Sequence, residues 1–211
     1  MGNGSVPTKN WILLLPNQLT ILRILLTPVF IVLLFSHGYL NKLIALAVFI
    51  LASTTDAYDG YLARKYNAMS PQGKFLDPLA DKILVLSAFF SFYYLGLYPL
   101  WMFVLILLRD VVITGLRTWM LARDTSLETS IFGKSKTVAQ MVGIYVLLVF
   151  VLLTHWHLFA FMNETLHWME INHVLWGLMF VVTLLTVGSG YHYLHVNWAL
   201  LKKILRDPSQ R

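Results

Sequence analysis

The sequence contains no cysteine and few charged residues for its length. Of its 211 residues, 12% are Asp, Glu, Lys or Arg and 58% are hydrophobic. A soluble domain has about 25% charged residues. A domain of this size has too small an interior to hide so much apolar surface, so lipid must cover the remainder. The absence of cysteine excludes disulfide bonds and thiolate metal sites.

The N-terminal region lacks a signal-peptide pattern, since no basic start leads to a cleavage site of the A-x-A kind. We therefore expect the first apolar run to remain as a membrane anchor. There is no internal repeat, low-complexity tract or sign of a second domain. Residues 1–211 are expected to form a single membrane domain, with a juxtamembrane segment at 1–16 and a cytoplasmic tail at 199–211.

Six apolar stretches are long enough, or nearly so, to cross a bilayer as helices. Short gaps separate them, which favours antiparallel neighbours within one bundle. The predicted fold class is all-α and integral to the membrane, a six-transmembrane-helix bundle with an additional interfacial helix over Val6–Leu15. The stretches are Leu19–Phe35, Leu43–Asp59, Pro78–Leu97, Leu100–Leu121, Val138–Trp156 and His173–Leu194.

The basic residues gather on one side of this bundle. Of the 16 lysines and arginines, Lys42 alone falls on the opposite side, and Arg109 falls within the fourth stretch. The excess of positive charge predicts that both termini face the cytoplasm. The net charge of +6 does not indicate a nucleic-acid partner, because the cations lie between apolar runs rather than along one polar face. Anionic headgroups and phosphorylated substrates explain them better.

Four aspartates lie at the cytoplasmic ends of the second and third stretches. Asp56 and Asp59 are spaced i, i+3, and Asp77 and Asp81 are spaced i, i+4, which puts each pair on one helical face. The short connection from Asn67 to Lys74 should bring the two helix ends together. Carboxylates so close would repel at low dielectric unless cations lie among them. All-oxygen ligation favours Mg²⁺ or Mn²⁺ over zinc.

Small residues and one arginine accompany these aspartates. Gly60 and Ala63 follow Asp59, and Gly73 is expected to precede the third helix, so a bulky ligand can approach the backbone closely. Arg64 is a fixed cation suited to a diphosphate. The full pattern is Asp56-x2-Asp59-Gly60-x2-Ala63-Arg64-x8-Gly73-x3-Asp77-x3-Asp81.

This pattern resembles the complete signature of the CDP-alcohol phosphotransferase family, with every position filled and every spacing kept. Eight fixed positions arise by chance about once in 10⁹ to 10¹⁰ start sites. The segment Asn17-x-Leu19-Thr20-x2-Arg23 resembles the family's N-terminal element. Two further segments resemble elements of the bacterial phosphatidylglycerophosphate synthases, with Thr114 where many members have serine. They are Arg109-Asp110-x3-Thr114-Gly115-Leu116-Arg117 and Gly133-Lys134-x-Lys136-Thr137.

The resemblance implies an enzyme of phospholipid biosynthesis that moves a phosphatidyl group from CDP-diacylglycerol to glycerol 3-phosphate, giving phosphatidylglycerophosphate and CMP. It implies a homodimer in the cytoplasmic (inner) membrane, with its active site facing the cytoplasm. It also implies two Mg²⁺ or Mn²⁺ ions held by Asp56, Asp59, Asp77 and Asp81, with Asp81 as the general base. The residues implied to contact the CDP-lipid are Asn17, Thr20, Gly60, Ala63, Arg64, Ser70 and Gly73.

The acceptor is inferred from four cations. Arg109, Arg117, Lys134 and Lys136 favour an acceptor that carries its own phosphate, and glycerol 3-phosphate fits them. Inositol phosphate, or phosphatidylglycerol as in cardiolipin synthesis, are alternative acceptors. A Mg²⁺ channel or transporter is an alternative of another class, although its acids would be expected through the membrane rather than at one end.

Each candidate also has a purely structural interpretation. The four aspartates could pair with Arg64, Lys74 and Lys82, and Arg109 could pair with Asp110 or with another helix. Arg117, Lys134 and Lys136 could be ordinary positive-inside residues. The Gly188-Ser189-Gly190 segment is more typical of close helix packing or a kink than of a ligand loop. His155 and His157 are more typical of an interfacial loop than of a metal site.

Overall fold

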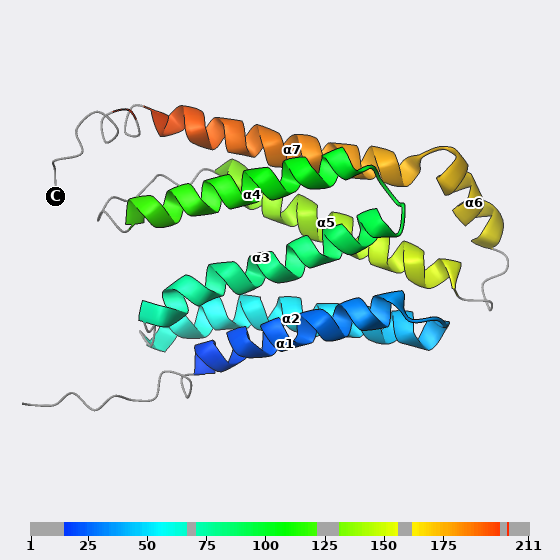
Figure 1. Cartoon of the computed structure of the whole chain (residues 1–211), viewed down its shortest axis with the longest axis horizontal. Coiled ribbons are helices and arrows are strands. Elements are labelled where there is room, and N and C mark those ends of the chain that lie inside the picture. Colours follow the sequence, from blue (N-terminus) through cyan, green and yellow to red (C-terminus); the bar gives the residue numbers. More distant parts are fainter. Residues whose placement is uncertain (1–14, 67–70, 122–130, 156–161, 199–201, 203–211) are drawn as a thin grey trace, which may run out of the picture. The chain divides into compact units, whose positions relative to one another are not determined.

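The structure is a computed structural model, and the part of the chain that it describes is helical (Figure 1). It describes residues 15–66, 71–121, 131–155, 162–198 and 202, with side chains at 20–55, 82–120, 135–155, 162–198 and 202. The chain divides into two compact units, residues 1–88 and 89–211. The helices are α1 (Leu15–Phe35), α2 (Tyr39–Tyr66), α3 (Pro71–Tyr94), α4 (Leu100–Leu121), α5 (Ile131–Thr154), α6 (Asn163–Ile171) and α7 (Val174–Val196).

Each predicted apolar stretch lies largely on a helix of its own, and the fourth coincides with α4. The second and third helices extend beyond their apolar parts, since α2 continues to Tyr66 and α3 begins at Pro71. The prediction that Gly73 and Lys74 precede the third helix is therefore wrong. Proline suits the first helical position because its φ is already helical. It also lacks an N–H, but an N–H at that position would have no partner within the helix. Most of the predicted interfacial helix, and Ser70, lie outside the described residues.

Two segments are long and apolar enough to cross a membrane, judged by length and composition: Ser135–Thr154 of α5 and Val174–Val196 of α7. The other apolar helical segments are shorter, at Thr20–Phe35, Tyr39–Thr55 and Lys82–Tyr94. Helix α4 has the necessary length, but Arg109, Asp110 and Arg117 interrupt its apolar sequence. The chain is thus all-helical over its described part, and the six-span bundle stays a prediction.

Within the first unit, α1 packs along α2 (Figure 1). The rings of Phe30 and Phe49 are both buried, with centroids 5.4 Å apart. Burying such side chains between two helices stabilises the pair by about 1.5–3 kcal/mol for each ring. Aromatic packing therefore helps to hold this helical hairpin together.

Two buried cations also join α1 to α2. Arg23 Nε donates to the carbonyl oxygen of Ala52 at 3.3 Å, and Lys42 Nζ donates to the carbonyl oxygen of Leu34. Leu34 lies in the last turn of α1, where carbonyl oxygens have no N–H donor within the helix, so Lys42 supplies a donor to one of them. Arg23, one of the cations predicted on the cytoplasmic side of the bundle, is buried between the two helices.

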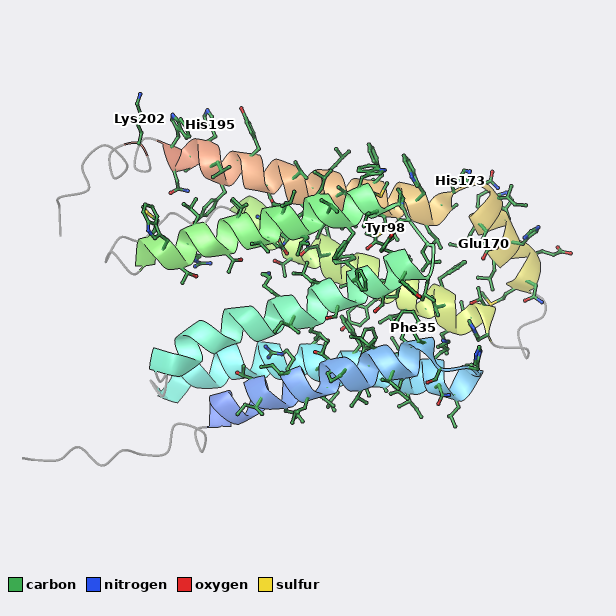
Figure 2. The ribbon with its side chains drawn as sticks, viewed as in Figure 1. Phe35, Tyr98, Glu170, His173, His195 and Lys202 are labelled. Atoms are coloured by element: carbon green, nitrogen blue, oxygen red, sulfur yellow. The ribbon has the colours of Figure 1, made fainter. Side chains whose placement is uncertain are left out.

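In the second unit, α7 packs against α4, α5 and α6 (Figure 1). Gly143 of α5 allows the close approach to α7, because a Cβ atom there would lie 3.1 Å from Cγ2 of Val182. Glu170 and His173 lie at the α6 end of α7, whereas His195 and Lys202 lie at its other end (Figure 2). The polar groups of α7 described below lie between these two ends.

The turn between α3 and α4 is held by a buried tyrosine. Tyr98 donates its hydroxyl to the carbonyl oxygen of Phe89 at 2.6 Å. Burial raises the pKa of Tyr98, because the phenolate would lose its hydration. Tyr98 therefore stays neutral at physiological pH and keeps donating to the end of α3.

Candidate active site

The predicted metal ligands lie on two helices. The helical backbone of α2 includes Asp56 and Asp59, and that of α3 includes Asp77 and Asp81. The predicted helical structure at these positions is confirmed, so the i, i+3 and i, i+4 spacings are helical spacings. The side chains of all four aspartates lie outside the described residues, and their roles as ligands and base stay predictions.

The predicted CDP-lipid contacts are spread over the first three helices. Gly60, Ala63 and Arg64 lie in the last two turns of α2, Gly73 in the first turn of α3, and Asn17 in the first turn of α1. For these residues the structure describes the backbone alone. Thr20 of α1 has a described side chain, which is buried. These contacts also stay predictions.

The predicted acceptor site contains a buried ionic cluster that joins α4 to α5. Asp110 Oδ1 accepts from Lys136 Nζ at 2.6 Å and from Arg109 Nη1 at 3.0 Å. The Asp110 side chain is fully buried, and those of Lys136 and Arg109 are 3% and 13% exposed. Among the residues that the structure describes, one carboxylate is thus shared by two cations in a site of low dielectric. The expected alternative of a pair between Arg109 and Asp110 is confirmed.

The same arginine also binds α7. Arg109 Nη2 donates to Ser189 Oγ at 3.0 Å, and Ser189 Oγ donates to the carbonyl oxygen of Thr186 at 2.7 Å. A Cβ atom at Gly190 would lie 2.8 Å from Arg109 Cγ, whereas one at Gly188 would meet nothing within 4 Å. The expected close-packing role of this glycine segment is confirmed at Gly190, and the group that packs there is an arginine side chain.

The four predicted acceptor cations are only partly brought together. Arg109 and Lys136 meet on Asp110. Arg117 is exposed two turns later on α4, and both it and Arg109 interact electrostatically with Tyr193 of α7. Lys134 lies in the first turn of α5, and its side chain is outside the described part of the chain. Their binding of an acceptor phosphate stays a prediction.

Sequence reasoning gave no site role to Asp110, Ser189 or Tyr193. Asp110 is an acid within an apolar helix, so the rule that singled out the motif aspartates applied to it as well. On α7, Thr186, Ser189 and Tyr193 recur at helical spacing and are all buried. That polar stripe was a visible signal, but no charge marked it.

Comparison with known proteins agrees with this arrangement of motif and cluster. The family model of the CDP-alcohol phosphatidyltransferases matches residues 13–176, which include the whole aspartate motif and the Asp110 cluster. The chain therefore belongs to the CDP-alcohol phosphatidyltransferase family, a family of enzymes.

The chain is also similar to individual proteins whose names state a reaction or a product. The chain is similar to the CDP-diacylglycerol–glycerol-3-phosphate 3-phosphatidyltransferase of Bacillus subtilis, 36% identical over 200 residues, covering 89% of this chain and 97% of that one. It is 40% identical over 144 residues to a probable phosphatidylglycerophosphate synthase of Mycobacterium tuberculosis, covering 67% of this chain and 68% of that one. A Cereibacter sphaeroides protein with the same name as the Bacillus one is 42% identical over 143 residues, covering 65% of this chain and 63% of that one.

Proposed function

We propose that the protein transfers the phosphatidyl group of CDP-diacylglycerol to glycerol 3-phosphate, giving phosphatidylglycerophosphate and CMP. The single observation that carries this proposal is the complete motif from Asp56 to Asp81 on two helices of a CDP-alcohol phosphatidyltransferase. The Bacillus subtilis relative is named for this reaction, and the similarity covers nearly the full length of both chains.

A divalent metal fits the donor set of the motif. Asp56, Asp59, Asp77 and Asp81 offer only oxygen ligands and four negative charges, the chemistry that Mg²⁺ or Mn²⁺ prefers. We propose that these four residues hold two such ions. When bound, the ions neutralise the diphosphate and stabilise charge on the attacking and leaving oxygens.

The chain's own residues would position the two substrates and move one proton. Asp81 removes the proton from the acceptor hydroxyl, whose oxygen then forms a bond to the lipid-bearing phosphorus. The bond from that phosphorus to the oxygen of CMP breaks, and CMP leaves. Arg64 holds the diphosphate as a fixed cation, and positioning supplies much of the rate. The residues that border the CDP moiety are Asn17, Thr20, Gly60, Ala63, Ser70 and Gly73.

The cations at and near Asp110 support a phosphorylated acceptor. Arg109, Lys136 and Arg117 carry three positive charges, and Asp110 cancels one of them. A phosphate monoester brings a charge of about −1.5 to −2 at neutral pH, which matches the remainder. We assign the acceptor phosphate to Arg109, Arg117, Lys134 and Lys136, with Asp110 as the residue that positions two of them.

We further propose that six helices cross the cytoplasmic membrane, that both termini and the active site face the cytoplasm, and that the protein is a homodimer. Cysteines introduced at Gly38 and Asn163 should react with an impermeant thiol reagent added outside the cell, and cysteines at Asn67 and Ser209 should not. The native chain has no cysteine to confuse the assay. The reversed labelling pattern would contradict this orientation, and cross-linking in native membranes tests the dimer.

The reaction is tested with purified protein, CDP-diacylglycerol and a panel of acceptors. Glycerol 3-phosphate, inositol phosphate, serine and phosphatidylglycerol are compared by CMP release and by mass spectrometry of the lipid product. We expect CMP and phosphatidylglycerophosphate with glycerol 3-phosphate. Turnover with another acceptor alone would refute the assignment of glycerol 3-phosphate as the acceptor. Mg²⁺ flux into sealed liposomes without CMP release would refute the assignment of the protein as an enzyme.

A further inference from the structure

Three buried polar atoms in the second unit have no hydrogen-bond partner in the described part of the chain. They are the hydroxyl oxygen of Tyr193 on α7 and, on α4, Nε of Arg109 and Oδ2 of Asp110, whose other oxygen is paired. Tyr193 is 8% exposed, so water reaches little of it. Native proteins pair nearly all of their buried polar groups, and an exception needs a specific explanation.

The arginine Nε and the tyrosine hydroxyl belong to side chains of two helices that pack together, α4 and α7. Arg109 lies against the backbone of Gly190 and donates to Ser189, four residues before Tyr193. Positions four apart on a helix share one face, so Ser189 and Tyr193 both lie on the side of α7 that receives Arg109. Tyr193 interacts electrostatically with Arg109 and with Arg117. Three side chains from two helices therefore converge on one region.

The chemistry of this region suits an anion. A guanidinium N–H can only donate, and the phenolic hydroxyl has its proton available. Ser189 is already occupied, because it accepts from Arg109 and donates to Thr186. Asp110 already accepts from Lys136 and Arg109. Apart from Oδ2 of Asp110, the atoms that remain are donors beside Arg109 and Arg117, and such donors match the oxygens of a phosphate group.

We propose that the Tyr193 hydroxyl and Arg109 Nε donate hydrogen bonds to the phosphate of the acceptor substrate, with Arg117 supplying the second positive charge. This proposal rests on the proposed function and adds Tyr193 as a binding residue. Tyr193 lies beyond residue 176, where the family match ends.

The geometry also explains how the site would select its acceptor. A phosphate satisfies both donors at once, whereas an acceptor with no phosphate leaves them buried and unpaired. Sites built to hydrogen-bond a polar group reject analogues that lack it far more strongly than apolar pockets reject small changes in size. Tyr193 adds this selectivity without adding charge.

The test is the Tyr193→Phe variant, assayed for CMP release at varied acceptor and donor concentrations. We expect KM for glycerol 3-phosphate to rise by about tenfold or more, with kcat and KM for CDP-diacylglycerol nearly unchanged. The thermal midpoint should stay the same or rise, because the lost hydroxyl has no partner within the described fold. Tyr191→Phe is the matched control, since Tyr191 is on the same helix and 72% exposed, and it should behave as the native protein.

Inorganic phosphate provides a second readout that does not depend on the identity of the acceptor. It should inhibit the native enzyme competitively with the acceptor, and Tyr193→Phe should weaken this inhibition by a similar factor. Unchanged acceptor KM and unchanged inhibition in Tyr193→Phe would overturn the proposal, as would a uniform loss of activity with a lowered thermal midpoint. If the native enzyme uses a different phosphorylated acceptor, only the glycerol 3-phosphate assignment fails, and the inhibition data still decide the role of Tyr193.

Discussion

The two units of the chain bury their cations in different ways. In the first unit, Arg23 and Lys42 donate to main-chain carbonyl oxygens across the α1–α2 pair. In the second unit, Arg109 and Lys136 share the carboxylate of Asp110. A carbonyl is a neutral partner that only fixes two helices together. A carboxylate instead determines how much charge remains in the site, so the second arrangement can serve binding as well as packing.

The units also differ in the sign of their candidate functional groups. The aspartate motif on α2 and the start of α3 belongs to the first unit. The proposed acceptor cations belong to the second unit, and they are Arg109, Arg117, Lys134 and Lys136. We infer a division of labour in which the acids serve the donor and the reaction, and the cations select the acceptor. Each prediction below tests one side of this division.

The largest effect is expected from removal of the metal or of one of its ligands. Asp56→Asn, Asp59→Asn and Asp77→Asn should each lower CMP release by about a hundredfold or more, because each deletes a negatively charged oxygen ligand. EDTA should abolish activity, and excess Mg²⁺ or Mn²⁺ should restore it. Near-native turnover in any two of these variants would refute the metal site.

Asp81→Asn should reduce kcat by about 10²- to 10⁴-fold, the usual contribution of a general base. CDP-diacylglycerol binding, measured by equilibrium binding with a radiolabelled donor, should be largely kept. A loss of donor binding that parallels the loss of turnover would leave Asp81 as a ligand and contradict its assignment as the base.

Asp110→Asn is the direct test of the contrast between the two kinds of buried cation. It leaves Lys136 and Arg109 buried without their shared counter-charge, which should cost about 3–5 kcal/mol in the free energy of unfolding. Acceptor KM should rise with it, because the two cations lose their fixed positions. The measurements are detergent-solubilised unfolding and initial rates.

Two further variants separate stability from binding in this test. The double variant Asp110→Asn with Lys136→Met also removes the buried charge of the lysine and should recover much of the stability, but not the acceptor affinity. Lys42→Met removes a cation that binds a carbonyl oxygen and should cost about 1.5–3 kcal/mol, with acceptor KM unchanged. Equal effects of Lys42→Met and Asp110→Asn on acceptor KM would contradict the inference that the cations paired with Asp110 bind the acceptor and Lys42 does not.

The smallest effect is expected from the glycine pair on α7. In Gly190→Ala the new methyl group would lie 2.8 Å from Arg109 Cγ, so the arginine must move and acceptor KM should rise a few-fold. Gly188→Ala is the control, because its methyl group would meet nothing within 4 Å. A larger effect from Gly188→Ala than from Gly190→Ala would contradict the assignment of Arg109 as a cation that binds the acceptor.

The helices could be predicted from the sequence where apolar runs determine them, and less well where polar residues continue them. The bounds of α4 follow from its apolar run. The end of α2 and the start of α3 do not, since Ala63, Arg64 and Lys65 are good helix formers but two of them are charged and end the apolar run. Helix α6 was not predicted, because its nine residues are short and mostly polar. Pro71 was an available signal for the start of α3.

The candidate sites divide in the same way. The aspartate motif could be found because its spacing is local to two neighbouring helices. The Asp110–Lys136 pair joins residues 26 apart, and the Arg109–Ser189 bond joins residues 80 apart. Such contacts depend on which helices pack together and in which rotation, and periodicity alone does not determine either. Tyr193 was missed for this reason.

The ionic cluster has a consequence for how the protein enters the membrane. Arg109 and Asp110 are adjacent in α4, and each costs about 2.5–3.5 kcal/mol when a helix centre inserts alone. Lys136 reaches the bilayer only with α5, and Ser189 only with α7. In the proposed topology α4 is therefore a poor membrane segment at the moment of its synthesis. Its stable insertion waits for α5, so truncation between these two helices should yield a product that the cell retains at the translocon or degrades.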